Sequence, residues 1–377
     1  MLFHYLKKYL IVFTSLNNYM YQYFYTLLFV PLLSVIAFLP LCKGLKFRVE
    51  IATVLLWVLV LAFFIFRDVY APADILAYIA LYDSMSGVDR VINAFQGDVT
   101  FSVFLYIGRL LDLNHEVFFT AFAVANVVIV FIGLKYLFQK QKYVIFSFIL
   151  FALTSSFVLM FLNGLRQGLA ISLFILSIAL YSRSNKVRSY LGMVLAIYSH
   201  SSVIPFVCFF VFRVYFIDRK VNYRIVLFVI PFLFLIGYGL VDILALNFDK
   251  FQRSVIYNNF SYNNSLVYLK ALLLYIFGVI FYMYGSKYKN FSIYGYRLIF
   301  DIYLFGLIIV FSTLPVLYIS SRFLYYPSAL MPIMFTYLFF SQKNFLNISH
   351  RRLVYLVGML IYGFFVCNYP SIQAQLW

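Results

Sequence analysis

The stretch Leu162-Asn163-Gly164-Leu165-Arg166-Gln167-Gly168-Leu169-Ala170 places strongly polar side chains at the boundary between two long apolar runs. Asn163-Gly164 is typical of a turn, so Arg166 and Gln167 are expected in the first turn of a new helix. The unpaired amides and positive dipole at a helix start attract anions, and a guanidinium adds to that attraction. This stretch therefore predicts an anion site, with a phosphate or diphosphate as its ligand. The alternative is that Arg166 only extends toward lipid headgroups.

The composition indicates the class of protein. Of the 377 residues, 65% are hydrophobic and 11% are charged, and a soluble domain of this length could not bury so much apolar surface. Apolar runs, most of them near the roughly 20 residues needed to cross a bilayer, recur along the chain. They fall at about 23–41, 51–66, 117–134, 143–162, 165–182, 190–216, 223–246, 266–285, 297–319, 323–341 and 353–369. Because backbone groups in lipid must bond within their own segment, these runs predict an all-α polytopic membrane protein, with residues 1–377 as a single integral-membrane domain.

The net charge of +17 does not call for a nucleic-acid partner, because the basic residues gather in particular connections. Nineteen of the 29 basic residues lie within 43–48, 135–142, 183–188, 213–224, 287–297 and 343–352. Nine of the 12 acidic residues lie in the connections between these, mostly in one long loop. The positive-inside rule assigns the basic connections to the cytoplasm and the acidic ones to the outside. Loops at about 67–116 and 247–265 are therefore the predicted outer loops.

The run 190–216 has basic connections on both sides, so it should enter and leave the membrane on the same face. Its middle is Tyr198-Ser199-His200-Ser201-Ser202, and Pro205 follows closely. A helix interrupted there would form a re-entrant hairpin, which is allowed where protein or a water-filled cavity shelters the irregular backbone. This interpretation gives ten transmembrane helices plus a hairpin, and eleven plain crossings are the alternative.

Two further elements carry candidate chemistry. His200 is the only one of the four histidines within an apolar run, which makes it a candidate general base or a donor to a phosphate or sugar hydroxyl. The alternative is a structural histidine bonded to a neighbouring carbonyl. In the first outer loop, Pro72 can begin a helix that places Asp74, Tyr78 and Tyr82 on one face. That face could bind sugar or supply a base, and an interfacial helix with its tyrosines among headgroups is the alternative.

Several cations are expected to gather on the outer side. Ser320-Ser321-Arg322 is predicted to be a very short outer connection, with Arg322 at the start of the helix that carries Tyr325-Tyr326. Converging cations suit a diphosphate leaving group, because they stabilise its developing charge. The predicted set is Arg67, Arg166 and Arg322, with Lys250 and Arg253 as additions. For Arg322 alone, a helix cap and membrane anchor is the alternative.

No motif for a cofactor or a metal occurs. The three cysteines are far apart and form no CxxC, and the sequence has no phosphate-binding glycine loop, no HExxH and no GxSxG. No cofactor is expected.

The stretch 163–170, the element Tyr198-Ser199-His200-Ser201-Ser202, the early Asp74 with Tyr78 and the late Arg322 with Tyr325-Tyr326 resemble the EpsG family of Wzy-type bacterial polysaccharide polymerases. The resemblance covers nearly the whole chain in layout, although Pro72-Ala73-Asp74 stands where the family usually has Gly-x-Asp. It implies a metal-independent, GT-C-like glycosyltransferase in the bacterial cytoplasmic (inner) membrane, with its active site facing the periplasm or exterior.

The resemblance also implies the substrates. The donor would be a glycan chain on undecaprenyl diphosphate, and the acceptor a new lipid-linked repeat unit of an O-antigen, capsule or exopolysaccharide. Membrane lipid and a chain-length regulator are further candidate partners. The predicted catalytic residues are His200, Asp74 and Arg166. The predicted substrate-binding residues are Arg67, Tyr78, Tyr82, Gln167, Arg253, Arg322, Tyr325 and Tyr326.

Three other functions share some of these features. A lipid-linked oligosaccharide flippase should show two related halves, and none is visible in the sequence. An O-antigen ligase usually has a large outer loop between two late spans, whereas the longest outer loop here is early. A membrane acyltransferase expects its acyl-donor contacts on the cytoplasmic side, opposite to the predicted position of Arg166 and Arg322.

Overall fold

The structure of the chain is a computed structural model that describes residues 48–65, 73–85, 98–216, 222–235, 264–287 and 294–341, together with positions 32–33, 35–36, 69 and 237. Every element within these ranges is helical, which confirms the all-α architecture. Five helices are long and apolar enough to cross a bilayer, and five shorter apolar helices accompany them. The chain is a multi-pass membrane protein. The predicted ten to eleven crossings include segments outside the described residues and stay a prediction.

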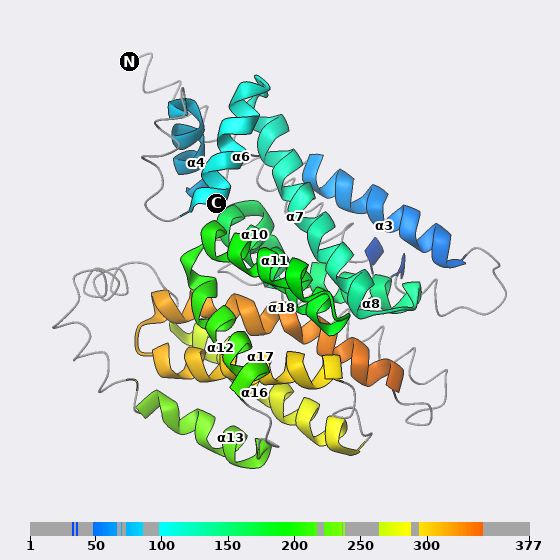
Figure 1. Cartoon of the computed structure of the whole chain (residues 1–377), viewed down its shortest axis with the longest axis vertical. Coiled ribbons are helices and arrows are strands. Elements are labelled where there is room, and N and C mark those ends of the chain that lie inside the picture. Colours follow the sequence, from blue (N-terminus) through cyan, green and yellow to red (C-terminus); the bar gives the residue numbers. More distant parts are fainter. Residues whose placement is uncertain are drawn as a thin grey trace.

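Helix α10 (Leu165–Ser182) lies at the centre of the bundle, between α7 (His115–Leu137) and α11 (Lys186–Ser199) (Figure 1). A Cβ at Gly133 of α7 would lie 3.2 Å from the backbone of α10, so this glycine permits a close approach of the two helices. Small residues at such contacts let membrane helices pack tightly. The predicted span 165–182 is confirmed at both of its ends.

The remaining helices form two groups around this centre. On one flank, α3 (Arg48–Ile65) and α8 (Gln141–Ala152) pack against α7 (Figure 1). On the other flank, α16 (Asn264–Lys287), α17 (Tyr294–Thr313) and α18 (Leu317–Ser341) pack together, and α17 and α18 reach α10. The short helices α13 (Tyr223–Val229) and η5 (Ile230–Phe232) lie beside this second group.

The predicted span 143–162 is wrong as a single helix. Helix α8 ends at Ala152, and α9 (Ser155–Val158) and the π-helical turn η3 (Leu159–Asn163) follow. The interruption has a local cause, because the Thr154 hydroxyl donates to the Phe151 carbonyl at 2.7 Å and accepts from the Phe157 amide at 3.1 Å. Hydroxyl side chains that bond to nearby backbone in this way end one helix and begin the next.

The boundary between the two late helices also differs from the prediction. The connection lies at 314–316 rather than at 320–322, because Pro315 lacks an amide and disfavours a helical residue before it. Arg322 therefore lies in the second turn of α18 and not in a connecting loop.

The chain from α11 to α12 follows the course that a re-entrant hairpin predicts. His200 is extended (φ −165°, ψ 128°) between α11 and the short turn η4 (Ser201–Val203), after which α12 (Ile204–Phe216) begins. Near its end, α11 accepts a hydrogen bond at the Leu195 carbonyl from Thr100, close to the start of α10. Arg213 of α12 donates to Asp301 of α17 at 2.6 Å, near the opposite end of the bundle. The two arms thus run in opposite senses, and each is only about 20 Å long, shorter than a bilayer core.

Candidate active site at the amino end of helix α10

A π-helical turn sets the start of α10. The Asn163 side chain at the end of η3 accepts the backbone amide of Asp74 at 3.0 Å, in the first turn of α4 (Ala73–Ser84). A Cβ at Gly168 would lie 2.5 Å from the Met160 carbonyl oxygen, so only glycine allows this turn to fold back on α10. Such π-helical turns occur frequently at functional sites. The turn fixes α4, predicted from Pro72 onward, against the amino end of α10.

Arg166 is held by two segments at once, α4 and the residue before α6 (Val99–Leu110). Its Nη1 forms an ion pair with Asp98, the residue just before α6. Its Nε donates to the Tyr78 hydroxyl at 3.4 Å, and the guanidinium lies 5.1 Å from the centre of the Tyr78 ring. The Arg166 side chain is 35% exposed, so a ligand arriving from outside the bundle can reach it.

Arg166, Tyr78 and Asp98 form a polar cluster at the amino end of α10, and Asp98 is the member that the sequence did not predict. Burial raises the pKa of its carboxyl, and the nearby Arg166 and Arg322 oppose that rise. The pKa of the Tyr78 hydroxyl is also raised, chiefly by burial, so this group stays protonated at neutral pH. The only sequence signal for Asp98 is an acid directly before an apolar helix, and its partner lies 68 residues away in the chain.

Gln167 connects the cluster to α18. Its side chain is buried, and Nε2 donates to the Arg322 carbonyl at 2.8 Å. This bond places the half-buried Arg322 near enough to Tyr78, Asp98 and His200 to influence all three electrostatically. Arg166 and Arg322, predicted to share a site, therefore do lie at the same end of the bundle.

His200 is a hydrogen-bond donor in this arrangement. Its Nδ1 accepts the backbone amide of Ser202 at 3.1 Å, so the proton of the neutral ring is on Nε2. Arg166 and Arg322 both lie near enough to act on this ring electrostatically. Of the two functional roles predicted for His200, the geometry favours the donor to an anion over the general base.

Tyr326 supports the tip of the hairpin. Its hydroxyl lies 2.9 Å from Ser202 Oγ, and its ring stacks on Phe206 with centroids 4.0 Å apart. The side chain is 1% exposed, which makes it a positioning residue rather than an open binding surface. Tyr325, one residue earlier, is half-buried.

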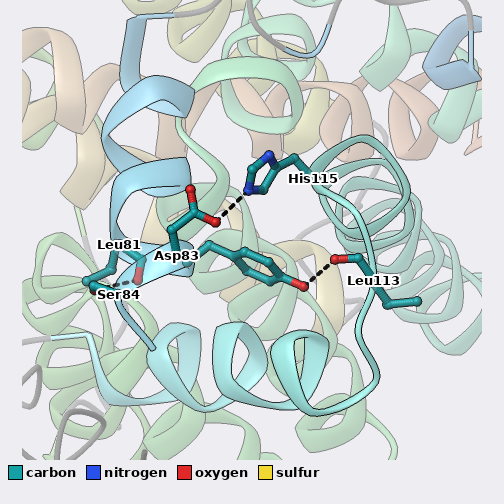
Figure 2. A network of polar contacts seen from close by, with 6 residues as sticks. Leu81, Asp83, Ser84, Leu113 and His115 are labelled. Atoms are coloured by element: carbon teal, nitrogen blue, oxygen red, sulfur yellow. Dashed lines mark hydrogen bonds and ion pairs between the residues drawn. The ribbon is translucent and has the colours of Figure 1, made fainter. Parts of the chain in front are cut away.

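Tyr82 shares a helix face with Asp74, as predicted, but does not join the cluster. It is fully buried, its hydroxyl donates to the Leu113 carbonyl at 2.7 Å, and its ring lies 4.9 Å from that of Phe118. Figure 2 shows the neighbouring Asp83 pointing toward His115, with Nε2 2.8 Å from the carboxylate. This part of α4 therefore attaches to α7. The predicted contacts Arg67 and Arg253 lie outside the described residues.

Comparison with known proteins identifies the family. A model of the EpsG family matches residues 51–377. The chain belongs to the EpsG family. EpsG proteins are Wzy-type polysaccharide polymerase-like membrane proteins, which confirms the resemblance found in the sequence. No curated protein and no solved structure matches the chain.

In this EpsG-family protein, the amino end of α10 combines groups that suit an anion with groups that suit a sugar. Two guanidinium groups and the Nε2–H of His200 come from three separate segments, and the first amides of α10 add a positive dipole. Asp74 and Asp98 supply carboxylates beside them, and Tyr78 supplies a ring and a hydroxyl. Such a site can stabilise a phosphate-containing leaving group next to an acceptor hydroxyl.

Proposed function

We propose that the chain is a polysaccharide polymerase. It transfers an undecaprenyl-diphosphate-linked glycan chain onto a new lipid-linked repeat unit at the outer face of the bacterial cytoplasmic membrane. Membership of the EpsG family supports the class of reaction. The observation that carries the proposal is the convergence of Arg166, Arg322 and His200 at the amino end of α10. A GT-C-like fold and a metal-independent mechanism complete the proposal.

The transfer step uses the groups in this cluster. An acceptor hydroxyl oxygen attacks the anomeric carbon of the donor, the bond from that carbon to the diphosphate oxygen breaks, and its electron pair leaves with the diphosphate. Arg166, Arg322 and the Nε2–H of His200 bind the departing charge. The acceptor proton passes to Asp74, the candidate base, whose carboxylate lies near Tyr78.

Asp98 has a different role from Asp74. Its carboxylate is already paired with Arg166, so it orients the guanidinium and competes with the substrate anion for it. Binding of a diphosphate would then exchange one anion for another around a cation that is held in place. Tyr78 and Tyr325, together with the predicted contacts Arg67 and Arg253, are assigned to the glycan and its lipid carrier.

The direct test is reconstitution of the full chain in proteoliposomes with the lipid-linked repeat unit of the organism that carries it. A polymerase lengthens the glycan and releases one undecaprenyl diphosphate for each repeat unit that is added. Translocation of the lipid-linked unit without lengthening would instead identify a flippase, and a single transfer to another acceptor would identify a ligase. Asp74→Asn should abolish lengthening, while Asp83→Asn, which affects only the contact with His115, should retain it.

A further inference from the structure

A cavity lies at the carboxyl end of α10, roughly 25 Å along the helix from Arg166. Its volume is about 450 Å³, and it is an open cavity lined by the α7–α8 connection, the end of α10, the start of α17 and the end of α18. A cavity of this size holds a small molecule or a headgroup. It takes no part in the transfer step described above.

The cavity has basic residues and no acid among the residues that line it. Lys140 and Arg183 belong to its lining, and Lys142 lies beside it. Within the described part of the chain, no carboxylate pairs with any of the three. The positive charges at this place therefore lack a counter-ion from the described residues, and an anionic ligand would supply one.

An aromatic wall holds two of these cations. The rings of Tyr143 in α8 and Phe340 in α18 stack with centroids 3.9 Å apart. The Lys142 ammonium lies 5.4 Å and 5.8 Å from their centres, and the Lys140 ammonium lies 5.7 Å from that of Tyr143. Ammonium groups within about 6 Å of aromatic rings are attracted to them electrostatically, so this wall favours positive charge at the edge of the cavity.

Hydrogen-bond donors also face the cavity. Arg183 uses its Nε to donate to the Tyr136 carbonyl at 2.7 Å, which fixes the guanidinium and leaves its terminal N–H groups for a ligand. Tyr337 lines the cavity, and its hydroxyl has no hydrogen-bond partner among the described residues. A phosphate oxygen is the kind of acceptor that a guanidinium and a phenol hydroxyl bind together.

We infer that this cavity binds the phosphate headgroup of an anionic phospholipid. The positive-inside rule assigns this end of the bundle to the cytoplasmic leaflet, where anionic lipids attract basic segments. The half-buried rings of Tyr143, Phe339 and Phe340 lie along the contact between α8 and α18, and offer an apolar surface for acyl chains. A free phosphate would use the cations but not this surface.

The position of the cavity gives the lipid a structural consequence. A headgroup bound there contacts the last turns of α10 and α18, whose opposite ends carry Gln167 and Arg322. The lipid would thus hold together, at one end, the same two helices that the Gln167 side chain connects at the other. This inference does not depend on the reaction that the chain catalyses.

The test is equilibrium binding to the purified full-length protein in detergent, read by native mass spectrometry. The probes are dioleoylphosphatidylglycerol, dioleoylphosphatidylcholine and inorganic phosphate. Each basic residue near an anionic lipid surface contributes about a fivefold factor, so Lys140→Gln with Arg183→Gln should weaken phosphatidylglycerol binding about 25-fold. The matched control Lys186→Gln with Arg188→Gln removes two exposed charges from the neighbouring helix α11 and should leave binding unchanged.

A second variant keeps the test valid if the double variant folds poorly. Tyr337→Phe removes one hydroxyl without changing the packing, and should weaken phosphatidylglycerol binding by a few fold. Equal binding of phosphatidylglycerol to the wild type and to both cavity variants would overturn the inference. Equal weakening in the control would also overturn it, by showing a general charge effect. Binding of inorganic phosphate as tight as that of phosphatidylglycerol would overturn the lipid assignment in favour of a free anion.

Discussion

Replacing Arg166 by lysine keeps the positive charge but removes the planar group that binds two partners at once. In the structure, Nη1 pairs with Asp98 while Nε donates to the Tyr78 hydroxyl. A lysine ammonium can reach one of these partners, and it would have to leave that partner to meet a diphosphate. Arg166→Lys should therefore be strongly impaired, whereas an arginine that only anchors its helix among headgroups could be replaced by lysine without loss.

The size of the effect follows from the lost contact. A hydrogen bond to a charged group contributes about 1.5–3 kcal/mol, so losing one from the departing diphosphate should lower kcat/KM about 10- to 150-fold. Removal of the whole guanidinium in Arg166→Ala should lower it further, because the half-buried Asp98 is then left without its cation. Both variants should accumulate single-repeat products.

The assay is complementation of a deletion strain, with polymer length read from the glycan ladder and the membrane level of each protein measured. The matched control is Arg109→Lys, since Arg109 is exposed at the end of α6 with its guanidinium 5.9 Å from the Tyr82 ring and outside the cluster. Control and wild type should give the same ladder. Normal long-chain polymer from Arg166→Lys at normal abundance would refute the reasoning.

Substitutions at three other positions, His200, Gly168 and Asn163, test the arrangement around Arg166. His200→Gln keeps an N–H donor and should retain more polymerisation than His200→Ala, and equal losses would contradict the donor role. Gly168→Ala should lower the Tm by several degrees, since its Cβ would meet the Met160 carbonyl at 2.5 Å. Gly278→Ala is the control and should lower the Tm less, because its Cβ would meet only side chains at 3.2 Å or more. Asn163→Ala removes the acceptor for the first turn of α4 and should reduce activity about fivefold. Asn163→Asp keeps the acceptor and should keep most of the activity. Equal activities of these two variants would contradict a capping role for Asn163.

The parts of the fold that the sequence predicted well are those fixed by local chemistry. The start of α10 follows from Asn163-Gly164, and the interruption at His200 follows from basic connections on both sides of one apolar run. The errors have local causes that hydropathy does not register. Thr154, which Ser155 and Ser156 follow, divides a run that is apolar on average, and Pro315 moves the boundary between α17 and α18.

The candidate site shows a different limit. Arg166 and His200 were predicted because a polar residue in or at the edge of an apolar run is costly and therefore visible in the sequence. Arg322 was predicted as a cation in a very short outer connection. Asp98 was missed because it lies in a polar loop, where an acid is ordinary, and its pairing with Arg166 is made only in the fold. Tyr82 was placed with Asp74 because helical spacing gives the shared face, but spacing does not reveal that α7 covers that face at Tyr82.

The central claim, that Arg166 at the amino end of α10 binds the diphosphate of the lipid carrier, is tested most directly by the affinity of the purified full-length protein for undecaprenyl diphosphate. This ligand is the same whatever the sugars are. The account predicts that Arg166→Lys raises the Kd at least about tenfold while Arg109→Lys leaves it unchanged. Equal affinity of the wild type and Arg166→Lys would contradict it.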